Sequence, residues 1–337
     1  MQNKYVSKGN VQLAYLILTH QFPELLARLV NRLNSPDTHF FIHVNAMTDI
    51  QPFLRALPPA ENVHFTDVRS KVHWRGFSTT AATLQLMKEV VEHEQDFKYC
   101  ILLSGADYPI KTRNHIQSFF ENATLEYIQY ARLQDFPSWQ QSQMPRIQHY
   151  YFNDALPYDR LRKKSRLFRL LRRKGFRLLS RIVPRQYPHG MVPYGGSTWF
   201  TLTGECVAYI IDYVRDNPRF LRYYRYTDAP DEMIFLTIVL NSHFADRTVP
   251  YKEYCRLTEI DNIDERWTEI ERTFPPESFH LRYVAFSHGG GGSPATLTEE
   301  DFAALENSEA LWARKMHPAT SARLLDMIDT QLLLHGQ

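Results

Sequence analysis

The first 130 residues alternate between short apolar runs and amphipathic stretches, and this alternation limits the possible folds more than any other feature of the chain. Four runs, "VQLAYLILTH", "HFFIHVN", "NVHFTD" and "YCILLSG", are typical of strands, and the last is apolar enough to be covered on both faces. Helices are expected between them over residues 23–33, about 49–57 and 79–94, the last with Ser78 as its N-cap. Strand–helix alternation predicts an α/β fold whose single, mostly parallel sheet is flanked by helices.

The pattern loosens after about residue 135, where an aromatic stretch, a basic segment and further strand and helix patterns follow one another. No repeat of fixed period and no long low-complexity linker divides the chain. We therefore expect one domain over residues 1–337, with a regular first half at about 11–130 and a mixed second half at about 131–320.

Composition is that of a globular protein, with 44% hydrophobic and 23% charged residues. The three cysteines, Cys100, Cys206 and Cys255, are widely spaced and fit neither a disulfide framework nor a zinc motif. The N-terminal apolar stretch of about six residues is shorter than a signal sequence or a membrane span requires. The sequence thus predicts a protein that stays in the reducing compartment where it is made.

A strongly basic segment lies at residues 160–185, which hold 12 of the 39 Lys and Arg and no acid. Its apolar residues recur at helical spacing, and the rest of the chain has a formal net charge of −10. A basic amphipathic helix is typical of binding to an anionic membrane surface, which is the interpretation we favour. A nucleic-acid partner is not expected, because no nucleic-acid-binding module accompanies the segment. A solvated helix on the surface of the protein is the simpler alternative.

Polar loops follow the predicted parallel strands, and ligands of such sheets bind outside the carboxyl ends of the strands. The loops "THQF", "HVN" and "SGADYPIK" carry His20, His43, Asn45 and Asp107.

Three acids, Asp228, Asp231 and Glu232, stand around Pro230 just before an apolar run in "YTDAPDEMIFLTIVLNS". Proline and acids in the first turn are what a helix start favours, so capping is the simplest role. Metal binding and proton transfer are the alternatives. A metal is the less favoured of these, because the chain has no D-x-D or H-E-x-x-H motif and Pro230 stiffens the loop.

Candidate anion-binding groups occur near the C-terminus. The stretch "HGGGGS" at 288–293 lacks the ending of a P-loop, and a flexible turn is its simpler interpretation. Arg282 precedes it, and Arg314 and Lys315 follow it, so these bases are candidates for neutralising a diphosphate. No G-x-S-x-G nucleophile motif is present, and Cys100 and Cys206 are expected in the apolar core.

Seven stretches in order resemble the core 2/I-branching β-1,6-N-acetylglucosaminyltransferase family, which also contains the peptide O-xylosyltransferases. They span residues 12 to about 316 and read "AYLILTHQFPELLARLVNRL", "FFIHVN", "NVHFTDVRSKVHWRGFSTTAATLQLM", "YCILLSGADYPIKT", "GGSTWFTLTGECVAYI", "PDEMIFLTIVLNS" and "LRYVAF…GSPATLTEEDF…LWARKM". The resemblance implies a glycosyltransferase A-type fold, with a nucleotide-sugar-binding first half and an acceptor-binding, catalytic second half.

The resemblance also implies roles for single residues. The family's general base falls on Glu232, and the two cations that replace a metal at the diphosphate fall on Arg282 and Lys315. Asp231, next to Glu232, is expected to have a structural role. Candidate nucleotide-sugar contacts are His20, His43, Asn45, Trp74, Asp107 and Tyr108, and candidate acceptor-side residues are Ser197, Trp199 and Asp231.

Two positions depart from the family pattern: Asn45 stands where Asp is usual, and Arg75 stands where Gly is common. The membrane anchor and disulfides of the eukaryotic members are also missing. These features favour a bacterial-type cytoplasmic enzyme of surface polysaccharide synthesis. Its basic segment is expected to hold it on the inner face of the membrane, near lipid-linked saccharide acceptors.

The sequence therefore predicts an inverting, metal-independent glycosyltransferase that moves a sugar, most simply GlcNAc, from a UDP-sugar to a hydroxyl of a glycan acceptor. No cofactor or metal is expected, since the UDP-sugar is a co-substrate. The alternative is a catalytically silent, membrane-associated protein that binds a nucleotide sugar or a glycan. A glycoside hydrolase is less favoured, because no pair of carboxylates across a scissile bond can be identified.

Overall fold

A computed structural model describes most of the chain: residues 11–135, 143–155, 174–176, 178–188, 190–249, 276–286 and 294–334, with residues 262, 265, 268, 269 and 272. The glycine-rich stretch at 288–293 and residues 160–173 of the basic segment lie outside these ranges.

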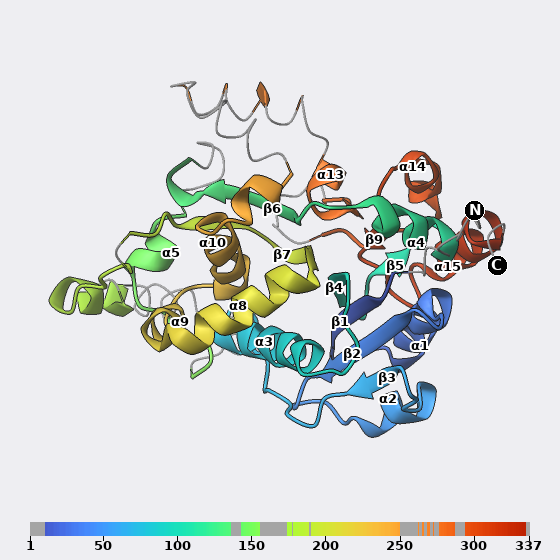
Figure 1. Cartoon of the computed structure of the whole chain (residues 1–337), viewed down its shortest axis with the longest axis horizontal. Coiled ribbons are helices and arrows are strands. Elements are labelled where there is room, and N and C mark those ends of the chain that lie inside the picture. The colour runs from blue at the N-terminus through green and yellow to red at the C-terminus, as the bar shows by residue number, and fades with distance from the viewer. Residues whose placement is uncertain are drawn as a thin grey trace, which may run out of the picture.

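A six-stranded sheet forms the centre of the molecule in the order β3-β2-β1-β4-β7-β6 (Figure 1). The first four strands of the chain are mutually parallel, whereas β7 runs antiparallel to both of its neighbours. The strands are β1 (Leu13–Thr19), β2 (Thr38–Val44), β3 (Val63–Phe65), β4 (Tyr99–Ser104), β6 (Tyr127–Arg132) and β7 (Tyr194–Thr203). This arrangement confirms the predicted fold class, a mostly parallel sheet flanked by helices and followed by a mixed second half.

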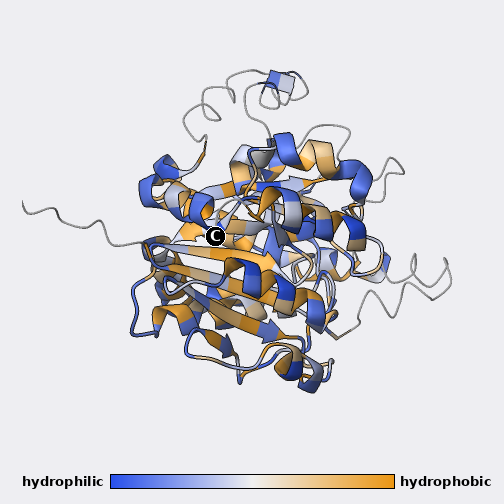
Figure 2. Ribbon diagram, turned by 90° about the vertical axis from the view of Figure 1, so that its right-hand side faces the viewer, coloured by the Kyte–Doolittle hydropathy of each residue, from blue (hydrophilic) through white to orange (hydrophobic). Residues whose placement is uncertain are grey.

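Helices cover both faces of the sheet, and the alternation of side chains along β1 shows why. Leu13, Tyr15 and Ile17 enter one apolar cluster, while Ala14 and Leu16 enter the other. The first cluster includes buried residues of α1 (Pro23–Leu33), α4 (Arg113–Asn122), α14 (Phe302–Asn307) and α15 (Ala322–Met327). The second includes those of α3 (Phe77–Val91), α8 (Gly204–Asp216), α9 (Pro218–Tyr224) and α10 (Ile234–Leu240). The central strands accordingly carry long hydrophobic stretches, drawn orange in Figure 2.

A small second sheet, in the order β5-β9-β8, brings C-terminal residues to the loop that follows β4. Its strands are β5 (Tyr108–Pro109), β8 (Arg282–Val284) and β9 (Trp312–Arg314), and α13 (Pro276–His280) precedes β8. The amide of Met316 donates to the carbonyl of Ala106 at 2.8 Å, which fixes the end of β9 against that loop. The sheet thereby places Arg282, Arg314 and Lys315 near the carboxyl end of β4.

Two local predictions need correction. Helix α3 begins at Phe77, with Gly76 rather than Ser78 at the N-cap, and Asp154 accepts from the Ser78 amide at 3.2 Å. A Cβ on Gly76 would lie 2.1 Å from Oδ1 of Asp154, so glycine lets this distant carboxylate cap the helix. The "PDE" residues form their own 3₁₀ turn, η2 (Pro230–Glu232), and the apolar helix α10 starts only at Ile234.

The described end of the basic segment is divided between surface and interior. Leu178 and Ile182 are 56% and 70% exposed, whereas Arg185 is partly buried and donates to the carbonyls of His149 and Tyr223, each at 2.6 Å. Arg185, at the end of the segment, therefore binds neighbouring loops of the protein. Among the helices that the structure describes, none is long and apolar enough to cross a bilayer.

Candidate active site at the carboxyl edge of the sheet

The acidic loop that the sequence singles out is a tight turn ahead of a buried helix. Ala229 adopts a left-handed conformation with φ of 47°, and the amide of Glu232 donates back to its carbonyl at 3.2 Å. Pro230 suits the first position of the turn because its fixed φ is helical and because the N–H group that proline lacks would have no hydrogen-bond partner at this position. All seven residues of α10 are buried behind it, so the turn stands on a rigid support.

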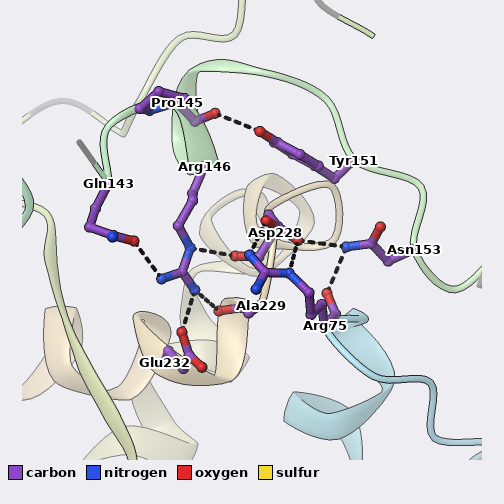
Figure 3. A network of polar contacts seen from close by, with 9 residues as sticks. All are labelled: Arg75, Gln143, Pro145, Arg146, Tyr151, Asn153, Asp228, Ala229 and Glu232. Carbon is purple, nitrogen blue, oxygen red and sulfur yellow. Dashed lines mark hydrogen bonds and ion pairs between the residues drawn. The ribbon is translucent and has the colours of Figure 1, made fainter. Parts of the chain in front are cut away.

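Glu232 is held by Arg146, which lies in the short helix α5 (Pro145–Gln148) (Figure 3). Nη2 of Arg146 is 2.7 Å from Oε2 of Glu232, and the guanidinium also donates to the carbonyls of Asp228 and Ala229 at 3.0 and 2.9 Å. The Glu232 side chain is nevertheless 38% exposed. Among the described residues none donates to Oε1, so the carboxylate is fixed through one oxygen and presents the other to its surroundings.

Asp231, the residue before Glu232, is hydrogen-bonded to the central sheet. The hydroxyl of Thr198 in β7 donates to its Oδ2 at 2.8 Å. Burial, followed by the charge of Glu232, raises the pKa of Asp231 to about 6. The two neighbouring carboxylates therefore differ in their partners: Asp231 is partly buried and bound to β7, and Glu232 is bound to an arginine with 38% of its side chain exposed.

Asp228 fastens this loop to the start of α3. Both of its oxygens accept from Arg75, at 2.8 Å for Nε, and Asn153 donates to Oδ1 at 2.9 Å (Figure 3). Arg75 has φ of 64°, the left-handed region that favours glycine. Its own carbonyl accepts from Ala229 at 3.0 Å, so side chain and backbone both lock the acid loop.

Cations gather beside the loop after β4. Arg314 donates from Nη1 to Ser104 at 2.9 Å and to Asp107 at 3.0 Å, and its side chain is 13% exposed. Arg282 is fully buried, donates to the carbonyls of His280 and Leu102, and has its pKa lowered to about 10 by burial. Among the described residues, neither buried Nε atom of these two arginines has a hydrogen-bond partner, so two donors are unpaired there.

Trp199 joins this cation cluster, which we define as Arg282, Arg314 and Lys315. Its ring lies 4.2 Å from the guanidinium carbon of Arg314 and 5.9 Å from that of Arg282. The neighbouring Thr198 is hydrogen-bonded to Asp231, so two consecutive residues of β7 contact the acidic turn and the cation cluster. Trp199, which the sequence predicts as an acceptor-side residue, thus also lies against the cation cluster.

Several other predicted residues lie at the same edge. The exposed His20 follows β1, and the pKa of its imidazole is lowered, first by loss of hydration among its neighbours and then by the charge of the partly buried Lys315. Trp74 is 54% exposed, 5.7 Å from the Arg75 guanidinium carbon. Ser197 accepts from the amide of Trp199 at 3.2 Å.

Three predicted nucleotide-sugar contacts are engaged elsewhere. Nε2 of His43 accepts from the Ser70 amide at 2.8 Å, and burial lowers the pKa of His43 to about 4. The Asn45 side chain binds the backbone of Val72 through both its oxygen and its nitrogen. The hydroxyl of buried Tyr108 donates to Asp329 at 2.7 Å. The side chains of His43, Asn45 and Tyr108 are hydrogen-bonded within the protein and fix the loops of this edge. A ligand bound here would contact the backbone of those loops.

Sequence reasoning missed Arg146, and it named Arg314 only as a flanking base. Arg146 lies in "QMPRIQHY", outside every recognised motif, and its partners are 82 to 86 residues away. The one local signal was Gln143, which accepts from Arg146 at 2.9 Å three residues earlier.

Fold and site together define an α/β protein with an accessible carboxylate and a cation cluster at the carboxyl edge of its sheet. The chain belongs to the Core-2/I-Branching enzyme family, whose model matches residues 13–268. It is similar to xylosyltransferase 2 of Rattus norvegicus, 25% identical over 97% of this chain and 34% of that protein. Human xylosyltransferase 1 is 24% identical over 98% of this chain and 31% of its own length.

The chain spans about a third of the length of these curated relatives. A solved structure, the apo form of the WbbM bifunctional glycosyltransferase, superposes with a TM-score of 0.32 at 10% identity, covering 71% of this chain and 38% of that one. That similarity is too low to bear on the fold.

Proposed function

We propose that the protein is an inverting, metal-independent glycosyltransferase of A-type fold that moves a sugar from a UDP-sugar to a hydroxyl of a glycan acceptor. The observation that carries the proposal is Glu232, a carboxylate held by Arg146 through one oxygen and 38% exposed at the sheet edge where ligands of parallel sheets bind. Membership of the Core-2/I-Branching enzyme family supports it.

The proposed chemistry assigns the proton and the charge to separate groups. Glu232 takes the proton of the acceptor hydroxyl while the oxygen of that hydroxyl forms a bond to the anomeric carbon of the sugar. The bond from that carbon to the diphosphate breaks on the opposite face, and its electron pair leaves with UDP. Arg146 keeps the carboxylate oriented, and Asp231 anchors the turn to β7.

The cation cluster suits the leaving group. The cluster holds three positive charges, and Arg314 is paired with one buried carboxylate, Asp107, which leaves an excess of positive charge for a diphosphate. The guanidinium of Arg314, whose Nε has no hydrogen-bond partner among the described residues, is a donor, and phosphate oxygens are acceptors. Because Arg282 is fully buried, Arg314 and Lys315 are the direct contacts in this proposal and Arg282 supports them from behind.

We assign GlcNAc as the transferred sugar on family grounds, with xylose as the competitor because the relatives are named xylosyltransferases. We also propose that residues 160–185 bring the enzyme to anionic membrane, where lipid-linked saccharides for surface polysaccharide are available. Exposed Leu178 and Ile182 support this part. Co-sedimentation with vesicles of anionic and of neutral lipid tests it, and equal sedimentation with both contradicts it.

The test of the function is donor hydrolysis and transfer with UDP-GlcNAc, UDP-xylose and other UDP-sugars in excess EDTA, comparing wild type with Glu232→Gln. We expect one donor to turn over in EDTA and the substitution to reduce transfer by roughly 10²–10⁴-fold while UDP still binds. Glu205→Gln is the matched control, since Glu205 pairs with Arg247 at 2.8 Å on the surface. UDP binding without turnover of any donor would instead favour the silent binding protein.

A further inference from the structure

Three histidines from separate parts of the chain meet on one face of the sheet. His39 lies in β2, His64 lies in β3, and His93 follows α3. Nδ1 of His39 is 3.4 Å from Nε2 of His64, and one ring nitrogen from each of the three lies within 4.8 Å of the others. All three side chains are half-buried, so they are shielded yet reachable.

The sheet register explains the meeting. Phe41 of β2 pairs with His64 of β3, and His39 lies two residues before Phe41, so His39 and His64 share a face. Residue 39 of β2 is also paired with Ala14 of β1. Helix α3 covers this face and ends at Val91, and the chain then turns so that His93 lies over the other two rings.

We propose that His39, His64 and His93 form a binding site for a divalent transition-metal ion of the Zn²⁺ class. Zinc binds histidine nitrogens at about 2.0–2.1 Å, which places two tetrahedral ligands roughly 3.3 Å apart. The His39–His64 separation already has this value. A small rotation of the His93 ring would bring its nitrogen to the ion as the third ligand. This rotation would break the hydrogen bond that Nδ1 of His93 accepts from the Gln95 amide at 3.0 Å. Water completes the set.

The surrounding charges suit a cation. Two carboxylates lie close enough to act electrostatically on the pair, Glu61 on His39 and Glu89 on His64. Glu89 is held in place by Thr66 and by Gln85, the latter at 2.8 Å.

The site lies away from the proposed transfer chemistry. Helix α3 separates them: its 15 residues are about 22 Å long, and Arg75 precedes its start whereas His93 follows its end. A bound ion would fasten the end of α3 to the β2–β3 edge. The expected effect is on stability, independent of whether the transferase proposal holds.

Titration of chelator-treated protein, carrying no histidine tag, with Co²⁺ tests the proposal. We expect one equivalent to bind with the visible d–d absorption of tetrahedral Co²⁺, and Zn²⁺ to displace it. Both His64→Gln and His93→Asn are expected to weaken binding at least tenfold, while His115→Gln, on the exposed face of α4, leaves it unchanged.

Thermal unfolding gives a second measurement. Zn²⁺ at 100 times its Kd is expected to raise the wild-type Tm by roughly 4 °C and to leave the Tm of His93→Asn unchanged. His64 also stacks with Phe41, and His39 meets Phe97 edge to face, so a purely aromatic cluster is the competing explanation. Absence of stoichiometric Co²⁺ binding, or binding that survives both substitutions, would establish that explanation and overturn the metal site.

Discussion

Arg146 donates from a single nitrogen to the carboxylate of Glu232 at 2.7 Å and to the carbonyl of Ala229 at 2.9 Å, so one side chain sets both the acid and the turn that carries it. Because a planar guanidinium is needed to reach several acceptors at once, lysine can replace the charge but not the geometry. The proposed base therefore depends on a residue that sequence motifs did not mark.

Replacing Arg146 tests this dependence. Arg146→Met removes four hydrogen bonds from a side chain that is 14% exposed, and we expect a loss of about 3 kcal/mol in the free energy of unfolding. In Arg146→Lys we expect kcat to fall by roughly 10–100-fold with little change in the KM for the UDP-sugar, because the carboxylate is misplaced while the donor contacts remain. Equal kcat in wild type and Arg146→Lys would contradict the positioning role. Arg215→Lys, at an exposed surface pair, is the control.

Asp231 predicts a pH dependence of stability. Its folded-state pKa is raised from 3.8 to about 6, so the folded protein binds the proton more tightly than the unfolded chain. Stability from this group is thus greatest below about pH 4 and falls as the pH rises through 6. Asp231→Asn imitates the protonated form, and we expect it to be more stable than wild type by on the order of 1 kcal/mol at pH 7.5.

Thermal unfolding of wild type and Asp231→Asn between pH 4 and pH 7.5 measures this difference. Asp212→Asn, an exposed acid in an i,i+3 pair, is the control that removes charge without burial. A wild-type advantage that grows toward pH 7.5 would reverse the expected sign and show that Asp231 is stabilising as an anion.

The first half of the fold was predictable because its signals are local. Each apolar run of residues 13–104 is long enough to be a buried strand, and the intervening helices carry their own periodicity. The capping of α3 was not predictable, because its acceptor, Asp154, is 76 residues from Ser78. The same distance argument applies to Arg146 and to the histidine trio, whose 25- and 29-residue separations match no metal motif.

The site was predictable in part for the same reason. Glu232 and Lys315 lie in motifs that can be read along the chain, but whether a cation is exposed depends on packing. Arg282 is covered on all sides, whereas Arg314, which lies over Trp199, keeps 13% of its side chain exposed. Sequence spacing treats these arginines alike, and only the tertiary fold separates them.

The left-handed backbone conformation of Arg75 can be tested by comparing its replacement with alanine and with glycine. Arg75→Ala and Arg75→Gly both remove the ion pair with Asp228, but only glycine occupies φ of 64° without steric cost. We expect Arg75→Gly to be more stable than Arg75→Ala by about 1 kcal/mol, measured by denaturant unfolding. Arg113, at the first position of α4 with ordinary helical geometry, supplies the control pair, in which alanine should be the more stable. The same order at both sites would contradict the strained backbone.

The last prediction concerns how the cation cluster recognises a ligand. Arg314 faces Trp199 and Asp107 and is the arginine of the cluster with an exposed fraction, so it should contact the diphosphate and not the base. We expect Arg314→Ala to weaken UDP binding by roughly 10–100-fold in calorimetry, the loss of one or two charge-assisted hydrogen bonds, and to leave uridine binding unchanged. Arg323→Ala, 77% exposed beside Glu299, is the matched control. A parallel loss for UDP and uridine would mean that Arg314 supports the architecture of the site, and the diphosphate contact would then pass to Lys315 alone.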